Sequence, residues 1–127
     1  MQRLKTRAQF QAAMTGGTVA RTAHFALHRL ALDMPTPPAR PALFAVPGVW
    51  LGVVLPKRWA RRAVTRNAIK RQIYTVGALF ETRLAQAAHV VRLRSAFDRQ
   101  QFVSARSEPL RQAVRAELVQ LFGQAAR

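Results

Sequence analysis

Residues 49–84 read VWLGVVLPKRWARRAVTRNAIKRQIYTVGALFETRL, and this stretch decides the fold because it holds a clear strand and a clear helix. The apolar run Val49 to Leu55 predicts a strand with Leu51, Val53 and Leu55 facing the core and Trp50, Gly52 and Val54 facing the other way. Gly52 leaves room for another segment to approach the backbone closely. Pro56 ends the strand because proline has no N–H to donate to a ladder.

The segment Ala63 to Leu84 predicts a helix, because its apolar residues recur at helical spacing and form a stripe that can pack on a sheet. The stripe consists of Ile69, Ile73, Val76, Phe80 and Leu84. A different side carries Arg66, Lys70 and Tyr74, with Asn67 and Arg71 beside them. No acid three or four residues away neutralises these cations, so an ordinary solvated face of mixed charge is a poor explanation for this side.

Positive charge is concentrated between the strand and the helix. Seven of the fifteen residues from Lys57 to Arg71 are Lys or Arg, and none is acidic. The whole chain has 21 Lys and Arg against five acids, a net charge of +16. Asp33 is the only acidic residue among the first 80. Eighteen of the cations are Arg, which suits bidentate contacts with phosphate. Such self-repulsion destabilises a compact fold unless a polyanion neutralises it, so nucleic acid is the expected partner.

Length and composition predict one folded domain, residues 1–127. Half of the residues are apolar, which is too many for a disordered basic tail. The chain has no cysteine, which excludes disulfides and Cys-based metal sites. No apolar run reaches the roughly 18 residues of a membrane span, and the first residues lack the apolar core of a secretion signal. We therefore expect a cytoplasmic protein with no membrane partner.

The N-terminal part predicts a helix and a strand. Arg3 to Met14 reads as a short amphipathic helix, with Phe10 as its core anchor, and Gly16-Gly17 ends it. Ala23 to Leu32 has the length of a strand, with Phe25 and Leu27 on one face and His28 on the other. Its periodicity does not separate a strand from a helix, and the flanking turn signals favour the strand. His24 and His28 would share that second face, but no third metal ligand lies at a useful spacing. A Pro-rich loop is predicted at residues 34–48.

The C-terminal part predicts a third strand and a closing helix. His89 to Arg94 reads as a short strand, so strand, helix and strand form a crossover unit in one sheet. Ser107 to Leu121 reads as the closing helix, with Ser107 as its N-cap and Gly123 where a C-cap glycine belongs.

Side chains for hydrolytic chemistry are missing from the sequence. A metallonuclease needs clustered carboxylates to hold divalent cations, whereas no two acids here are closer than nine residues. There is no Gly-rich phosphate loop and no nucleophile motif. Arg side chains could instead contact phosphates, and Phe10, Phe25, Trp59 and Tyr74 could stack on bases.

The stretch LGVVLPKRWARRAVTRNAIKR resembles the signature of the bacterial ribonuclease P protein component. That signature is a strand, a basic turn and a helix that opens with Arg-Asn-Arg and a short basic run. Arg66 and Asn67 match its first two positions, and Ile69, Lys70 and Arg71 match the residues after it. The segments RLKTRAQFQAAM, HFALH and VVRLR resemble the family's opening helix, first strand and third major strand. The resemblance covers nearly the whole chain apart from the Pro-rich insertion.

The resemblance implies a single α+β domain with a central mixed sheet, in the order α-β-β-α-β-α, similar to the second domain of ribosomal protein S5. It also implies a left-handed crossover, where the general rule favours a right-handed one. The family protein is the small subunit of a ribozyme whose large RNA removes the 5′ leader from precursor tRNA by Mg²⁺-dependent hydrolysis. The implied partners are therefore the catalytic RNA and precursor tRNA. The Mg²⁺ would be bound mainly by RNA, with no catalytic residue or metal ligand in the protein.

The resemblance also implies two sets of site residues. Contacts with the catalytic RNA would come from Lys57, Arg58, Arg61, Arg62, Arg66, Asn67, Lys70 and Arg71. A cleft between the opening helix and the sheet would hold the single-stranded leader, lined by Lys5, Phe10, Met14, Phe25 and His28. The chain departs from the family at Ala68, where the second Arg of Arg-Asn-Arg is usual. Met14 and His28 stand where an aromatic residue and Tyr are common.

Two other functions remain open from the sequence. A structural ribosomal or ribosome-associated protein would share the basic α+β composition. A stand-alone metal-dependent nuclease is the least favoured alternative, because the sequence lacks the clustered carboxylates that would hold its metal ions. The oligomeric state is also open.

Changing Arg66 and Lys70 to Ala is expected to weaken RNA binding without loss of the fold, because neither lies on the apolar stripe.

Overall fold

The computed structural model describes residues 1–31, 48–97 and 108–126. The bulk of the predicted Pro-rich loop and the predicted N-cap Ser107 lie outside the described residues. The elements in chain order are β1 (Gln2–Arg3), α1 (Arg7–Met14), β2 (Thr18–Arg21), β3 (Phe25–Ala31), β4 (Trp50–Val54), α2 (Ala63–Leu79), a 3-10 turn (Glu81–Arg83), β5 (Ala87–Leu93) and α3 (Glu108–Ala125).

The strands form one mixed sheet in the order β1-β4-β5-β3-β2. Strand β4 is parallel to both β1 and β5, whereas β3 is antiparallel to both β5 and β2. The central strand β5 is buried along nearly its whole length. The register places Gly52, Val90, His28 and Thr18 in one row across four strands.

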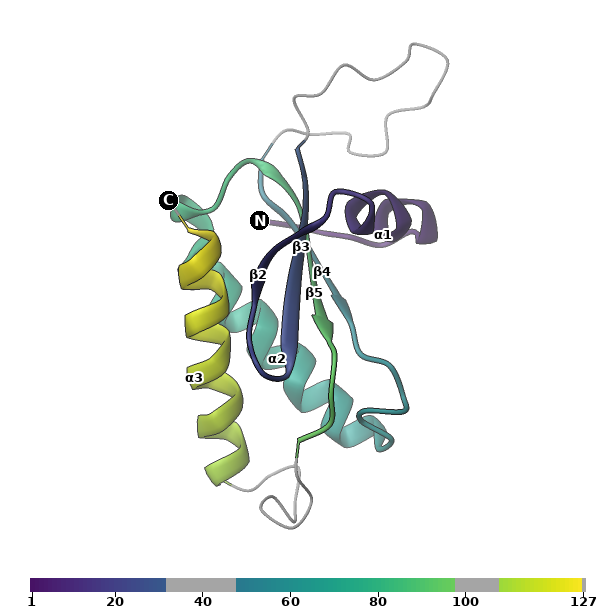
Figure 1. Cartoon of the computed structure of the whole chain (residues 1–127), viewed down its shortest axis with the longest axis vertical. Coiled ribbons are helices and arrows are strands. Elements are labelled where there is room, and N and C mark those ends of the chain that lie inside the picture. Colours follow the sequence, from purple (N-terminus) through teal and green to yellow (C-terminus); the bar gives the residue numbers. More distant parts are fainter. Residues whose placement is uncertain (32–47, 98–107, 127) are drawn as a thin grey trace.

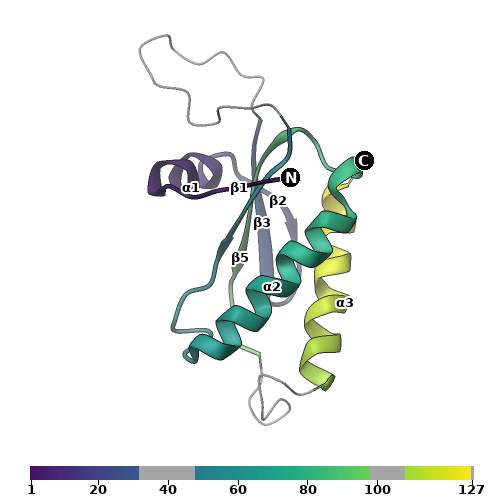
Figure 2. The same ribbon diagram turned by 180° about the vertical axis from the view of Figure 1, so that it is seen from behind.

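Helix α2 connects the parallel strands β4 and β5 by a left-handed crossover. Figure 2 shows α2 in front of the sheet, with β4 and β5 both running downward and β4 to the left of β5. When that view is rotated by 180° in the plane of the page, both strands run upward. Strand β5 then lies to the left of β4, and α2 is still in front of the sheet. This is the rare hand among crossovers, and it agrees with the fold implied by the family resemblance.

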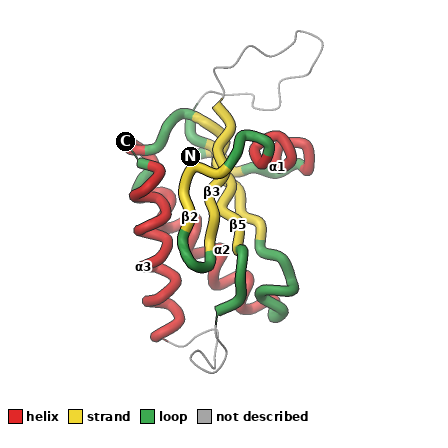
Figure 3. Tube along the Cα trace, in the orientation of Figure 1, coloured by secondary structure: helices red, strands yellow, loops and turns green. Residues whose placement is uncertain are grey.

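Helices cover both faces of the sheet, so the molecule has three layers. Figures 1 and 3 show α1 and α3 on opposite sides of the strands. Helices α2 and α3 pack on one face, where Leu27, Leu51 and Phe122 are fully buried. Helix α1 covers part of the other face, where Trp50 and Val90 are buried. The predicted alternation along β4 is confirmed, but its second face is also buried, because α1 lies on it.

The missing side chain of Gly52 allows α1 to lie close to the sheet. A Cβ atom at this position would come 2.6 Å from Cε1 of Phe10 and 2.7 Å from Cδ1 of Leu4. Both distances are shorter than any normal carbon contact, so only glycine fits without a shift of its neighbours. The sequence-based expectation that another segment approaches the backbone here is confirmed, and α1 with its preceding residues is that segment.

The element boundaries differ from the predicted ones in several places. The first helix begins at Arg7, because Thr6 caps it in a reciprocal capping box with Gln9. Arg3, predicted to be helical, instead belongs to β1. Helix α2 ends at Leu79, and the 3-10 turn then brings the buried Leu84 to the core. Gly123 is not a cap, since α3 continues to Ala125.

Candidate nucleic-acid interface

Helix α2 begins in a strongly basic environment that its own sequence does not neutralise. Its N-cap is Arg62, whose side chain makes no capping hydrogen bond, and the first turn has no acidic residue. The N-terminus of a helix carries partial positive charge, so cations at this end are unfavourable and an anion there is stabilising. Arg61, Arg62 and Asn67 are exposed. The start of α2 therefore favours an anionic partner.

Arg66 organises the basic turn that precedes the helix. Its Nη1 donates hydrogen bonds to the carbonyl oxygens of Ala60 at 2.9 Å and Arg61 at 2.8 Å. The guanidinium of Arg58 lies 5.1 Å from the ring centroid of the half-buried Trp59 in the same turn. Arg66 therefore has a structural role that its position off the apolar stripe did not reveal.

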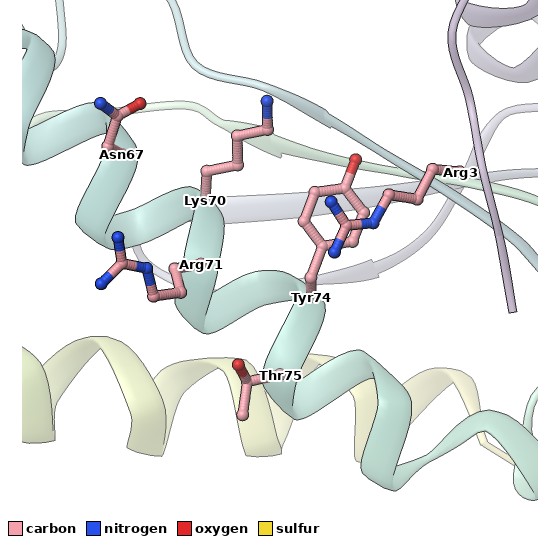
Figure 4. A pocket seen from close by; sticks show the side chains of 6 residues that line it. All are labelled: Arg3, Asn67, Lys70, Arg71, Tyr74 and Thr75. Atoms are coloured by element: carbon pink, nitrogen blue, oxygen red, sulfur yellow. The ribbon is translucent and has the colours of Figure 1, made fainter.

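An open hollow of about 410 Å³ lies beside the exposed face of α2 (Figure 4). It is lined by Arg3, Asn67, Lys70, Arg71, Tyr74 and Thr75. Four of the predicted RNA-contact residues thus form one surface with the turn: Arg66 at its start, then Asn67, Lys70 and Arg71 along the hollow. The other predicted contacts, Lys57, Arg58, Arg61 and Arg62, are exposed in the preceding turn and at the helix start.

Arg3 joins this surface from a distant part of the sequence. Its guanidinium carbon lies 4.0 Å from the centroid of the Tyr74 ring, a cation–π contact. The parallel pairing of β1 with β4 brings it there, with Arg3 opposite Leu51. Burial raises the pKa of Tyr74, and the nearby Arg3 lowers it in part. The Tyr74 hydroxyl is therefore protonated near neutral pH and can donate a hydrogen bond.

The α1 face of the sheet carries most of the predicted leader-binding residues. Phe10 and Met14 are half-buried and pack against the small core beneath α1. Lys5 is exposed just before the helix. His28 lies on the same face, in the same cross-strand row as Gly52, over which Phe10 packs. In that row only Val90 lies between His28 and Gly52, so these two residues are two strand spacings, or about 10 Å, apart.

Burial and neighbouring arginines favour the neutral form of His28. Its Nε2 accepts a hydrogen bond from Nε of Arg92 at 3.3 Å, so the proton of the neutral ring lies on Nδ1, which faces the Thr18 hydroxyl at 3.3 Å. Burial lowers the pKa of His28, and the positive charges of Arg92 and Arg21 lower it further. Arg92 thus belongs to this surface, although no pattern in the sequence indicates this role.

Phe25 does not join the other predicted leader residues. It has no exposed surface and lies in the core on the α2 and α3 face, tilted against Phe97 at 5.9 Å between ring centroids. This placement corrects the expectation that it lines a leader cleft. The strand alternation already separates Phe25 from His28, because the two are an odd number of residues apart.

Within the described ranges, no three His, Asp or Glu side chains come close enough to hold a metal ion. The same ranges contain no helix that is both long and apolar enough to cross a bilayer.

The fold and these surfaces define a class of protein: a small, strongly basic α+β domain with arginine-rich surfaces suited to a polyanion. The family model described as Ribonuclease P matches residues 1–122, and the chain belongs to this family.

Known relatives and structures agree with that assignment. The chain is 40% identical over 80 residues to the ribonuclease P protein component of Burkholderia mallei, covering 61% of this chain and 57% of that protein. It is 39% identical over 77 residues to that of Ralstonia pickettii, covering 61% and 54%. The matches thus span little more than half the length of these relatives.

Solved structures share the fold at lower sequence identity. The RNase P protein of Staphylococcus aureus at 2.0 Å has a TM-score of 0.68 and 18% identity, covering 97% of this chain and 94% of that one. A second structure of the S. aureus protein has a TM-score of 0.57 and 20% identity, covering 98% and 91%.

Proposed function

We propose that this chain is the protein subunit of a ribonuclease P in the cytoplasm, assisting removal of the 5′ leader from precursor tRNA. The catalytic RNA binds the basic turn and the exposed face of α2, and the leader binds the α1 face of the sheet. The RNA holds the Mg²⁺ ions and performs the hydrolysis, so the protein contributes binding and no catalytic residue. The observation that carries this proposal is the uncompensated basic surface around α2 in a member of the Ribonuclease P family.

The geometry of α2 supports a contact with folded RNA. Lys70 and Arg71 reach the hollow from successive positions, Arg3 comes from β1, and Tyr74 adds a hydroxyl donor (Figure 4). Arginine forks suit phosphate oxygens, and their convergence from two elements fixes the spacing between the phosphates that they contact. The described residues that line this hollow include no acid that would repel a polyanion.

The α1 face supports a contact with a single strand. Phe10 offers a half-buried ring, and His28 with Arg92 offers a polar edge about two strand spacings away. Unpaired bases bind proteins by stacking on rings and by hydrogen bonds to their edges. This spacing suits a base that stacks near Phe10 while its edge or its phosphate reaches Arg92.

The first experiment measures cleavage of precursor tRNA by an in vitro transcribed catalytic RNA of bacterial ribonuclease P, with and without the protein. At low Mg²⁺ we expect the protein to restore cleavage, because its cations replace part of the screening that Mg²⁺ supplies. The protein alone should not cleave. Absence of any stimulation by folded protein at low Mg²⁺ would contradict the proposed function.

The second experiment tests the leader. Phe10→Leu keeps an apolar side chain against Gly52 but removes the aromatic ring. We expect it to weaken binding of a precursor with a leader of several nucleotides to the protein–RNA complex, while binding of mature tRNA stays unchanged. Equal effects on both RNAs would show that Phe10 is a core residue only.

A further inference from the structure

Helices α2 and α3 enclose a second groove, of about 600 Å³, which the proposed function does not use. It lies on the face of the sheet opposite to α1. Its lining residues are Val64, Asn67, Ala68, Ile69, Arg71, Gln72, Thr75, Leu110, Arg111, Val114 and Arg115. The floor is apolar and buried at Ile69, Leu110 and Val114, and the rim is polar or basic.

The rim of this groove is positively charged on both helices. Arg71 stands on α2, and Arg111 and Arg115 stand one turn apart on α3, all three exposed. Among the described residues that line the groove, none is acidic. Glu108 lies 3.6 Å from Nη1 of Arg111, but both side chains are more than 60% exposed, so this ion pair is weak.

The groove is continuous with the hollow proposed to bind the catalytic RNA. Asn67, Arg71 and Thr75 line both, and they succeed one another at intervals of four residues as a single ridge along α2. Figure 4 shows Thr75 on the side of α2 nearest to α3, whereas Lys70 points away from α3. A ligand that crosses this ridge therefore passes directly from the hollow into the groove.

Two features keep the groove open and fixed in shape. Ala68 on α2 has only a methyl group, at the position where the family resemblance places an arginine. Gln72 donates from Nε2 to the carbonyl oxygen of Arg111 at 3.0 Å, which ties α3 to α2. Ala68 thus leaves α2 without one arginine at this point, and α3 places Arg111 and Arg115 in the lining of the same groove.

We propose that the catalytic RNA crosses the Arg71 ridge and that Arg111 and Arg115 of α3 hold its phosphates in the groove between α2 and α3. This proposal rests on the proposed function and extends the RNA surface from α2 to α3, a helix that the proposed function does not include. A basic rim with no acid among its described residues favours a phosphate backbone over an apolar peptide helix, for which the three arginines would have no partner.

The test measures the affinity of the full-length protein for in vitro transcribed catalytic RNA, without tRNA, over a series of salt concentrations. The variant Arg111→Ala/Arg115→Ala is compared with Arg7→Ala/Arg83→Ala, which removes the same charge from elements that line neither the groove nor the hollow. Two lost phosphate contacts reduce the magnitude of the log–log salt slope by about 1.5, and the affinity near 0.15 M salt by roughly twentyfold. The control should lose much less of both.

A second pair of variants separates charge from shape. Ala68→Glu places a carboxylate in the groove, and Ala68→Gln places a neutral side chain of the same size there. We expect the Glu variant to bind the catalytic RNA several-fold more weakly than the Gln variant, with the difference shrinking at high salt. Circular dichroism should show that both variants are folded.

The outcomes distinguish the two proposals. If Lys70→Ala weakens RNA binding but the Arg111/Arg115 variant behaves like its control, the groove proposal is wrong and the proposed function stands. If neither Lys70→Ala nor the Arg111/Arg115 variant changes binding, the proposed docking of RNA on α2 fails as well. Equal affinity of the two Ala68 variants at low salt would also overturn the groove proposal.

Discussion

Arg66 shows how one side chain can belong both to a binding surface and to the fold. Its guanidinium bridges two carbonyl oxygens of the basic turn, so the turn and the helix start are held together by the same group that the family resemblance assigns to RNA. Lys70 lies one turn later and is exposed. Both residues had the same predicted role, because hydrogen bonds from a side chain to a preceding turn leave no periodic signal in the sequence.

We therefore expect Arg66→Ala and Lys70→Ala to differ in stability. Loss of the two hydrogen bonds should lower the free energy of unfolding by about 1 kcal/mol. Lys70→Ala should change it by less than about 0.5 kcal/mol, as for most exposed substitutions. Urea unfolding followed by circular dichroism measures both. Equal stabilities would mean that the Arg66 hydrogen bonds do not persist in solution.

Two buried histidines predict how stability depends on pH. Burial lowers the pKa of His28 and of His89, and nearby arginines lower both further, while the hydrogen bond from Nε2 of His89 to the Ala85 carbonyl partly opposes this. The folded pKa of each thus lies below the ordinary value of about 6.5, and the neutral ring is favoured. Their stabilising contribution is complete above pH 6.5 and is lost as the pH falls toward the lowered pKa values.

The free energy of unfolding should therefore decrease between pH 7.5 and pH 5. The loss is about 1.4 kcal/mol for each unit by which a pKa is lowered. His89→Leu removes one titrating group from a site with no solvent exposure, so it should flatten this dependence. Urea unfolding at several pH values, with the wild-type protein as the reference, measures the change. An unchanged slope in His89→Leu would mean that His89 does not titrate differently in the folded and unfolded states.

At the scale of the elements, the spacing of apolar residues predicted the strand β4 and the three helices, and the run HVVRLR predicted β5. The strand β3 was predicted from its length and its flanking turn signals, because periodicity there does not separate a strand from a helix. The sequence did not predict β1 and β2. Gln2–Arg3 is too short to show a pattern, and its pairing with β4 depends on residues about 48 positions away. The basic half of the site was predicted as a contiguous segment. The sequence did not predict that three further arginines lie beside α2, because only the tertiary fold brings them there: Arg3, Arg111 and Arg115.

Two glycines in helices should respond to the same substitution in opposite ways. A Cβ on Gly77 of α2 would lie 2.7 Å from Cδ2 of the fully buried Leu51, whereas nothing lies within 4 Å of a Cβ on Gly123 of α3. Gly123→Ala should therefore raise the free energy of unfolding by about 0.5–1 kcal/mol. Gly77→Ala should lower it by about 1–2 kcal/mol, because overpacking outweighs the gain in helix propensity. Urea unfolding of the two variants in parallel provides the comparison, and destabilisation by Gly123→Ala would show that its helical placement is wrong.

At the scale of the whole molecule, the net charge of +16 should make salt act in opposite directions on folding and on binding. Added NaCl screens the self-repulsion of the folded chain and should raise its melting temperature. The same salt weakens RNA binding through counterion release. With six to ten phosphate contacts, the affinity should fall by about 10³–10⁵ between 50 and 200 mM. Thermal unfolding and filter binding over one salt series measure both effects, and an affinity that does not depend on salt would exclude a binding mode based on phosphate contacts.

The position of β5 has a consequence for synthesis on the ribosome. In the part of the chain that the structure describes, strands β3 and β4 do not pair with each other, and each pairs with β5, which is the last of the described strands. Until residues 87–93 have left the ribosome, the sheet exists only as two separate pieces, β2 with β3 and β1 with β4. Nascent chains that end before residue 87 therefore expose the edges of both pieces, and the sheet can close only after β5 has emerged.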